Sequence, residues 1–332
     1  MTSPLYTIKG NTLIKSKVHQ SIREQERRIR DLINEPRKRY TLIKKLGLWH
    51  QLCSCLDVIG DTELAIITYT AQELGANIGA TYLAVYGLLQ ALFLQQDAIF
   101  NLCESLGISD NISNYPGLQE IREIRNASIG HPTKRGRKRP FSYHAISRLS
   151  LSSKGFQLLT SDETGTSKFE WISIPKLIAD QHSYASAIFT SIIEKLEQEE
   201  AAHKEQFKKE KLVAVFSATL AYHLEKVFES IRSGENPAFG AINLGILTQA
   251  LKDLQAVLAK RGIELDTYEV IEDLYEELAY PMSELETYLQ HLEKGQKPNI
   301  NEKTAYIFAF FVTKKIDELK DVAKEIDEEY AQ

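Results

Sequence analysis

The sequence predicts a mainly α-helical protein with one small antiparallel sheet, on the basis of three observations. Between residues 43 and 130, apolar side chains recur at helical spacing. Between about 144 and 174 the period changes to two, in the short runs HAISRLSLS, GFQLLTS and KFEWISI. From Pro175 onward helical spacing returns and continues almost to the last residue. A chain of 332 residues is long enough for two domains with a core each.

Four helices are predicted in the first helical region. The first covers about 43–59, and the second opens at Asp61, a residue type favoured as a helix N-cap. The third covers about 82–106 and is apolar on almost every side, which is typical of the central helix of a bundle. The fourth begins at Pro116 and ends near Gly130, where we expect the glycine to adopt the left-handed conformation that closes many helices.

The complete predicted organisation has four parts. They are a basic N-terminal arm (1–42), a helical bundle (43–140), a three-stranded antiparallel meander (141–175) and a C-terminal helical domain (176–332). Such a small sheet is not stable alone, so we expect it to pack on a helix. The C-terminal helices are predicted at about 175–210, 211–233, 240–261, 267–294 and 301–329.

Composition and motifs exclude several classes of protein. The first residues contain no apolar segment typical of a secretion signal, and YIFAFFV (306–312) is too short to span a bilayer. Three cysteines form no disulfide framework and suit a reducing cytoplasm, so we expect a cytoplasmic protein away from membranes. The chain contains no glycine-rich phosphate loop, no GxSxG elbow and no HExxH motif.

A metal site is not expected either. His50, Cys53 and Cys55 lie close together in the sequence, but they fall inside an apolar helical pattern where buried free cysteine is common. No second pair of ligands follows at the spacing of a zinc site. We therefore predict no metal and no cofactor.

The segment IREIRNASIGHPTKRGRKRP (121–140) contains the strongest candidate site. Arg125 and Asn126 lie near the end of the fourth predicted helix, and His131 follows where the helix stops. The spacing alone is weak evidence, because Arg139 and His144 fit it as well, as do Arg137 and that same histidine. Those pairs lie where the bundle has ended and the strands begin, so the context favours Arg125 and His131.

A bundle helix that ends in RNASIGHP, after a long apolar helix containing QQD, resembles the HEPN domain family. The ribonuclease members of that family have an Arg, then a polar residue that is often Asn, and a His after four to six intervening residues. That motif maps onto Arg125, Asn126 and His131. The resemblance covers about residues 43–135 and extends neither to the meander nor to the C-terminal helices.

The resemblance implies an endoribonuclease that needs no metal and acts in defence against phage, in stress or in a toxin–antitoxin pair. It also implies a symmetric homodimer in which two copies of the motif form one cleft. The residue types suit this chemistry. Histidine can act as a general acid or base near neutral pH, and arginine can hold a phosphate through two donors. Asn126 is expected to orient His131 or a phosphate oxygen.

Other roles remain open for these residues. Arg125 could pair with Glu120 or Glu123, and His131 could interact with the helix dipole. Asp97 either tunes His131 or is bonded to Gln96 or to a helix end. The basic run after the motif either guides RNA or is a solvated loop, and it comprises Lys134, Arg135, Arg137, Lys138 and Arg139.

Two further regions carry uneven charge. The arm contains a basic group that is either a solvated helix face or a nucleic-acid contact: Arg27, Arg28, Arg30, Arg37, Lys38 and Arg39. Residues 261–332 contain eighteen acidic against eight basic residues, and we expect the C-terminal helices to sense a signal, bind a regulatory partner or ligand, or cover the basic loop. His223 is expected to be an ordinary bundle residue.

The sequence leaves two alternative functions. One is a non-catalytic HEPN-like module that binds RNA or a nucleotide, and the other is a helical interaction protein without a nucleic-acid partner.

Overall fold

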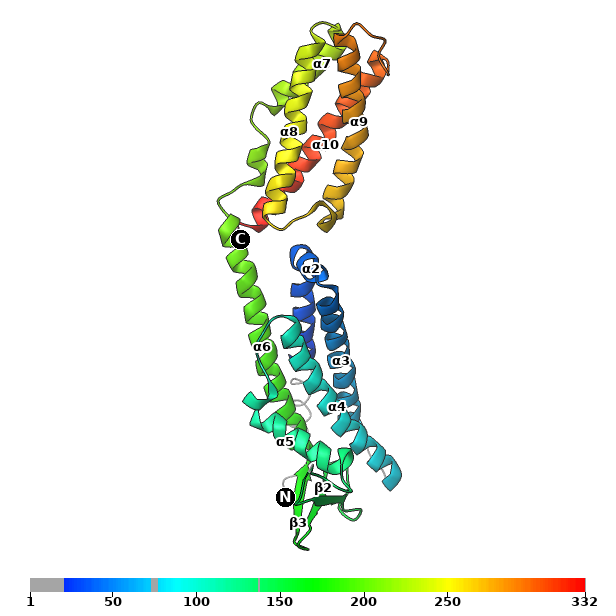
Figure 1. Cartoon of the computed structure of the whole chain (residues 1–332), viewed down its shortest axis with the longest axis vertical. Coiled ribbons are helices and arrows are strands. Elements are labelled where there is room, and N and C mark those ends of the chain that lie inside the picture. The colour runs from blue at the N-terminus through cyan, green and yellow to red at the C-terminus, as the bar shows by residue number, and fades with distance from the viewer. Residues whose placement is uncertain (1–20, 73–76, 137, 332) are drawn as a thin grey trace, which may run out of the picture. The chain divides into compact units, whose positions relative to one another are not determined.

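A computed structural model describes residues 21–72, 77–136 and 138–331, and it confirms a mainly helical chain with one small sheet. The chain forms two compact units. The first comprises the described residues up to Glu35 together with Leu42–Glu197, and the second comprises Pro36–Thr41 and Gln198–Gln332. Figure 1 labels their elements.

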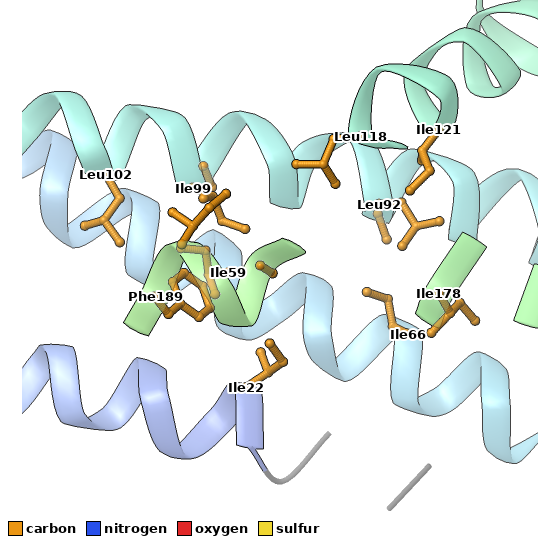
Figure 2. Close-up of a cluster of buried hydrophobic side chains, with 14 of the residues drawn as sticks. Ile22, Ile59, Ile66, Leu92, Ile99, Leu102, Leu118, Ile121, Ile178 and Phe189 are labelled. Carbon is orange, nitrogen blue, oxygen red and sulfur yellow. The ribbon is translucent and has the colours of Figure 1, made fainter. Parts of the chain in front are cut away.

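The first unit is a helical bundle that carries the sheet next to α5 (Figure 1). Its elements, in chain order, are a helix at 21–34, α3 (Leu46–Ala71), α4 (Ile78–Ser105), the 3-10 helix η1 (Ile112–Asn114), α5 (Pro116–Arg125), the π-helix η2 (Asn126–Gly130), β1 (Ser142–Ile146), β2 (Gly155–Asp162), β3 (Ser167–Ser173) and the first part of α6 (Ile174–Phe207). Five of these helices, the one at 21–34 and α3 to α6, bury apolar side chains in one core, in which Ile59, Ile99 and Phe189 lie close together (Figure 2).

The predicted helix boundary at Asp61 is wrong, because α3 continues unbroken from Leu46 to Ala71. Ile59 and Ile66 are fully buried on either side of that point. Gly60 has no neighbour within 4 Å of its missing Cβ, so it packs in the helix without strain. Burial of the flanking isoleucines outweighs the local preference of glycine and aspartate for a helix end.

The helix at 21–34 is part of the core rather than an arm. Ile22, Ile29 and Ile33 are buried against the rest of the first unit. The basic residues between them point outward, and several pair with acids: Arg28 lies 2.6 Å from Glu197, and Arg30 contacts Glu26 and Asp57. The positive charge of this helix is thus partly neutralised by its neighbours.

The sheet is the predicted meander, with strand order β1-β2-β3 and both pairs antiparallel. On its inner face, Phe156, Leu158 and Ile172 pack into the core of the first unit and are buried there. The expectation that the sheet packs on helices therefore holds. β1 is shorter than its alternating pattern suggested and ends at Ile146.

Helix α6 has 34 residues, and its first part completes the bundle. Leu177, Phe189 and Leu196 are buried in the core of the first unit, so this unit extends to Glu197 rather than ending near residue 176. Residues from Gln198 onward belong to the second unit. The sequence alone did not reveal this division, because the helix has no break there.

The second unit is a separate helical bundle with its own core. Its elements are α2 (Pro36–Ile43, the first six residues), the end of α6, η3 (Leu212–Val215), α7 (Leu220–Ser233), α8 (Pro237–Lys260), η4 (Leu265–Thr267), α9 (Glu269–Glu293) and α10 (Glu302–Glu329). Arg261 is fully buried and lies 3.4 Å from the Asp327 carboxylate. His223 bonds Asn243 at 2.7 Å, as expected of a bundle histidine.

Helix α4 is long and apolar enough, by length and composition alone, to cross a membrane. Uninterrupted apolar runs in the sequence do not show this property, because glutamine and aspartate interrupt the helix. Core helices of bundles share the property, and α4 buries Leu88, Leu92 and Leu102 within the first unit.

Candidate functional site

The candidate motif lies where the regular helix changes its winding. Helix α5 ends at Arg125, and residues Asn126–Gly130 continue as a π-helix in which the His131 N–H donates to the Asn126 carbonyl at 2.7 Å. Short π-turns within helices are frequent at functional sites. The end near Gly130 was predicted, but the wider turn was not, and Gly130 does not adopt the left-handed conformation.

Arg125 is held in place by two neutral amides. Its Nε and Nη2 donate to Gln90 Oε1 at 3.2 and 2.7 Å, and its Nη1 donates to Asn126 Oδ1 at 2.9 Å. These bonds use three of the five guanidinium N–H groups and leave one on each terminal nitrogen. Two such N–H groups side by side match two oxygens of a phosphate.

The charge of Arg125 is not neutralised within the described part of the chain. Neither Glu120 nor Glu123 pairs with it, and Glu123 instead contacts Arg135. The guanidinium carbon lies 4.4 Å from the centre of the Phe93 ring, so the group makes a cation–π contact with this ring. The side chain is therefore fixed in position but still carries a full charge.

Gly130 provides the space that the Arg125 side chain occupies. A Cβ atom at this position would lie 2.9 Å from Arg125 Nη1 and 3.2 Å from Asn126 Oδ1. The π-turn thus brings its last residue against the guanidinium of Arg125, the residue that precedes the turn. A side chain at residue 130 would push Arg125 away.

His131 follows the π-turn and is exposed. Its imidazole has no hydrogen-bond or ion-pair partner among the residues that the structure describes. Its backbone, in contrast, is fixed by the bond to Asn126. The ring is thus available to a ligand at the surface, next to the residue that orients Arg125.

His144, the competing histidine, has a structural role. Its Nδ1 lies 3.0 Å from Thr160 Oγ1 and its Nε2 lies 3.0 Å from Ser142 Oγ, so both ring nitrogens are occupied. Burial, assisted by the nearby Arg135 charge, lowers the pKa of His144. These contacts leave no ring nitrogen for a ligand.

Asp97 contacts Arg122 rather than a residue of the motif. Arg122 also donates from Nε to Gln96 Oε1 at 2.8 Å, and its guanidinium carbon lies 4.6 Å from the Phe93 ring. Arg122 and Arg125 therefore both make cation–π contacts with the Phe93 ring. Asp97 neutralises the first of them and leaves the second charged.

A chain of buried polar side chains leads inward from Arg122. Gln96 Nε2 donates to Gln181 Oε1 at 2.8 Å, and Gln181 Nε2 donates to Gln95 Oε1 at 2.9 Å. Gln95 in turn donates to Glu63, which also bonds His182 at 3.1 Å. Buried polar groups need partners, and this chain supplies them across α3, α4 and α6.

Gln90 and Phe93, which hold Arg125 from α4, were missed in the sequence, although a signal was present. Gln90, Phe93 and Asp97 are spaced three and four apart on α4, and Arg122 and Arg125 are three apart on α5. Two helices with such spacing can pair these side chains across their contact. The sequence analysis singled out Asp97 on this helix but did not connect it with the polar and aromatic residues on the same side.

The basic run is a tight hairpin rather than an open loop. Arg135 exchanges two backbone hydrogen bonds with Ser142, at 2.8 and 3.0 Å, and the His144 N–H donates to the Pro132 carbonyl at 2.7 Å. Lys134 lies 4.1 Å from the Phe141 ring centre, and Arg139 lies 3.5 Å from Glu163. Lys138 is exposed, and Arg137 lies outside the described residues.

The other candidate positions have structural partners or lie apart. Arg37 and Lys38 contact Glu200 and Glu199, respectively. Cys55 is buried, which raises the pKa of its thiol to about 11. Within the described ranges, no group of three or more His, Cys, Asp and Glu side chains is arranged to hold a metal.

At the candidate site Arg125 and Asn126 are half-buried and His131 is exposed. A cavity of about 480 Å³ in the first unit is lined by residues such as Arg30, Asp57 and Glu63, and does not include Arg125 or His131. Small molecules are usually bound in enclosed pockets, whereas an extended polymer can bind across an open surface.

The chain matches no model of a known protein family, no curated protein and no solved structure.

Proposed function

We propose that this chain is an endoribonuclease of the HEPN type that cleaves RNA through attack by the 2′-hydroxyl group and needs no metal. The observation that carries the proposal is Arg125. Two neutral amides and an aromatic ring hold its guanidinium, while its charge and two of its N–H groups remain free. A residue that only stabilises a helix end would pair with one of the nearby carboxylates.

In this mechanism the RNA 2′-oxygen forms a bond to the adjacent phosphorus, and the bond from phosphorus to the 5′-oxygen breaks. A base removes the proton of the 2′-hydroxyl, and an acid protonates the departing 5′-oxygen. The exposed imidazole of His131 takes one of these two roles. Arg125 offsets the negative charge that grows on the phosphate oxygens. The products are a 2′,3′-cyclic phosphate and a free 5′-hydroxyl.

A second copy of the chain can complete the site. The apolar side chains Leu83 and Leu94 of α4 are 77% and 41% exposed. They lie on the same side of the helix as Gln90, because the three positions are spaced seven and four residues apart. A partner that covers this stripe would meet the edge where Gln90 holds Arg125. We therefore propose a symmetric homodimer through α4.

The test is cleavage of a labelled RNA in EDTA. Wild type should cut it and leave 2′,3′-cyclic phosphate ends, which mass spectrometry identifies, while 2′-O-methyl RNA of the same sequence stays intact. Arg125→Ala and His131→Ala should each lower the rate by about 10²-fold or more, with unchanged thermal unfolding. Cleavage of 2′-O-methyl RNA, or wild-type rates in either variant, would refute the mechanism.

The runner-up function, a module that only binds RNA, gives a different result in the same assay. It predicts RNA that stays whole but shifts in a gel, with binding that weakens steeply as salt rises. Size-exclusion chromatography with light scattering tests the dimer. Leu94→Arg should give a monomer that has lost cleavage, and a fully active monomer would exclude the composite site.

A further inference from the structure

The outer face of the meander presents aromatic side chains to solvent. In an antiparallel sheet, directly paired residues share a face, and every second residue of a strand faces the same side. Leu159 of β2 pairs with Phe169 of β3, and Gln157 pairs with Trp171. Tyr143 of β1 pairs with Ser161 on that same side. We call Tyr143, Phe169 and Trp171 the aromatic face.

The aromatic face is exposed, whereas apolar side chains on the opposite face of the sheet are buried in the core of the first unit. Tyr143, Phe169 and Trp171 are 38%, 59% and 53% exposed, respectively, whereas Phe156 and Ile172 on the inner face are buried. The inner residues already anchor the sheet to the bundle, so the aromatic face is not needed for that contact. Three large rings on one small solvated surface are unusual unless they bind something.

The indole of Trp171 lies close to Gly155 of the neighbouring strand. A Cβ atom at Gly155, on the neighbouring strand, would lie 2.9 Å from Trp171 Cζ2. Gly155 has a φ of +154°, a region that other residues rarely adopt. The glycine therefore leaves room for the indole, and one face of the ring stays open to solvent.

The charge around the aromatic face suits an anionic partner. Residues 132–173 contain eight Lys and Arg against three Asp and Glu, whereas the whole chain carries a net charge of −5. All three acids are engaged: Glu163 with Arg139, Glu170 with Lys168, and Asp162 with backbone N–H groups of its own turn. Lys138, Arg148 and Lys154 are exposed and have no carboxylate partner among the described residues.

Backbone hydrogen bonds connect the sheet directly to the candidate catalytic motif. The His144 N–H of β1 donates to the carbonyl of Pro132, the residue that follows His131. The bonds between Arg135 and Ser142 extend the same connection. A strand of RNA bound on the sheet would thus continue over a basic hairpin toward Arg125 and His131.

We propose that the aromatic face is a base-stacking platform for single-stranded RNA, which rests on the proposed function in taking RNA as the substrate. Phe169 and Trp171 are two residues apart on one strand, about 7 Å, so each ring can stack on a different base. Stacking requires an unpaired base with an open face, and so selects single strands over duplex. The basic side chains contact the phosphates and add no sequence preference.

Binding is measured with the full chain carrying His131→Ala, which removes cleavage from the readout. In this background Trp171→Ala and Phe169→Ala should each weaken binding of a fluorescent single-stranded RNA by about 5- to 150-fold. Trp171→Phe, which keeps a ring, should bind within a few-fold of the parent. Tyr280→Ala is the matched control, because Tyr280 is an aromatic residue of the second unit with 63% exposure.

A second readout reports stacking itself. The chain has two tryptophans, so Trp49→Phe leaves Trp171 as the only one. Single-stranded RNA should quench its fluorescence, and duplex RNA of the same sequence should not. Absence of quenching, or wild-type affinity in both alanine variants, overturns the platform. A change from dimer to monomer in Trp171→Ala with unchanged RNA affinity would likewise overturn it and identify a protein interface.

The two proposals fail in different ways. If wild type cleaves RNA but the alanine variants bind normally, the platform is wrong and the catalytic site stands. If the variants lose binding but wild type cleaves nothing, the platform stands and the chain is a binding module. If wild type binds no RNA at all, both proposals are refuted.

Discussion

The sharpest test of the candidate site is the substitution Gly130→Ala, because it should change activity and stability in different directions. The new methyl group would lie 2.9 Å from Arg125 Nη1, whereas ordinary contacts begin at 3.4 Å. The guanidinium must therefore move by about 0.5 Å or more, and its bond to Asn126 must lengthen or break. The fold itself can accommodate the change, because the atom that moves is the far end of a flexible side chain.

The magnitude follows from this displacement. A misplacement of about 1 Å in a catalytic group can slow a reaction by about 10²-fold, which corresponds to about 2.7 kcal/mol of activation free energy. We therefore expect cleavage to fall by about 10- to 100-fold. In a helix interior, alanine is more favourable than glycine by about 0.5–1 kcal/mol. The free energy of unfolding should thus stay equal or rise while the activity falls.

The assay compares initial cleavage rates and thermal unfolding of wild type, Gly130→Ala and a matched control. Gly60→Ala is suitable as the control, because Gly60 is also helical but has no neighbour within 4 Å of its missing Cβ. It should gain the same helical stabilisation and keep full activity. Wild-type cleavage by Gly130→Ala would show that the position of Arg125 does not matter, and would refute the reasoning.

Four further outcomes are expected. His144→Ala should leave cleavage nearly unchanged, since both ring nitrogens of His144 are engaged in the sheet; a loss as deep as that of His131→Ala would mean that the wrong histidine was chosen. The lowered pKa of His144 favours its neutral form in the fold, so its contribution to stability is present at pH above the unperturbed value of about 6.5 and is lost as pH falls through that value. Wild type should accordingly lose thermal stability relative to His144→Gln between about pH 7.5 and 5.5, and parallel pH profiles would contradict this. Burial raises the pKa values of Cys55 and Cys103 to about 11 and 12, so neither thiol should react with a thiol reagent at pH 8 until the chain unfolds, and rapid labelling of either residue in the native protein would show that its helix opens. Gln181→Leu should lower the free energy of unfolding by about 1–3 kcal/mol, because it removes the hydrogen-bond partner of Gln95 Oε1 and of Gln96 Nε2, and a denaturation curve that matches wild type would show that water replaces the lost bonds.

The meander was predicted because its signal is local. Alternation along KFEWISI and the turn residues around Gly165 are properties of a few neighbouring residues, and the structure has β3 at Ser167–Ser173. The helix boundary at Asp61 failed for the opposite reason. Local preference favoured a break there, but burial of Ile59 and Ile66 against other helices decided the outcome.

The candidate site was predicted in its members but not in its geometry. Arg125, Asn126 and His131 were found from their order in the chain, whereas the partners of Arg125 come from α4, about thirty residues earlier. Asp97 was assigned to His131 or a helix end, and the structure pairs it with Arg122 instead. Pairing between helices depends on their relative rotation, which a single sequence does not specify.

The π-turn at Asn126–Gly130 has a consequence for how this motif tolerates changes in length. A π-turn arises when a helix accommodates one additional residue in a single turn, and here that turn is the last one before the helix ends at Gly130. Removing one residue between Arg125 and His131 would therefore return the segment to ordinary α-helix and leave α5 intact, while shortening the distance along the chain by one step. A single insertion or deletion in this segment would thus change the direction of His131 relative to Arg125 and leave the packing of the helical bundle unchanged.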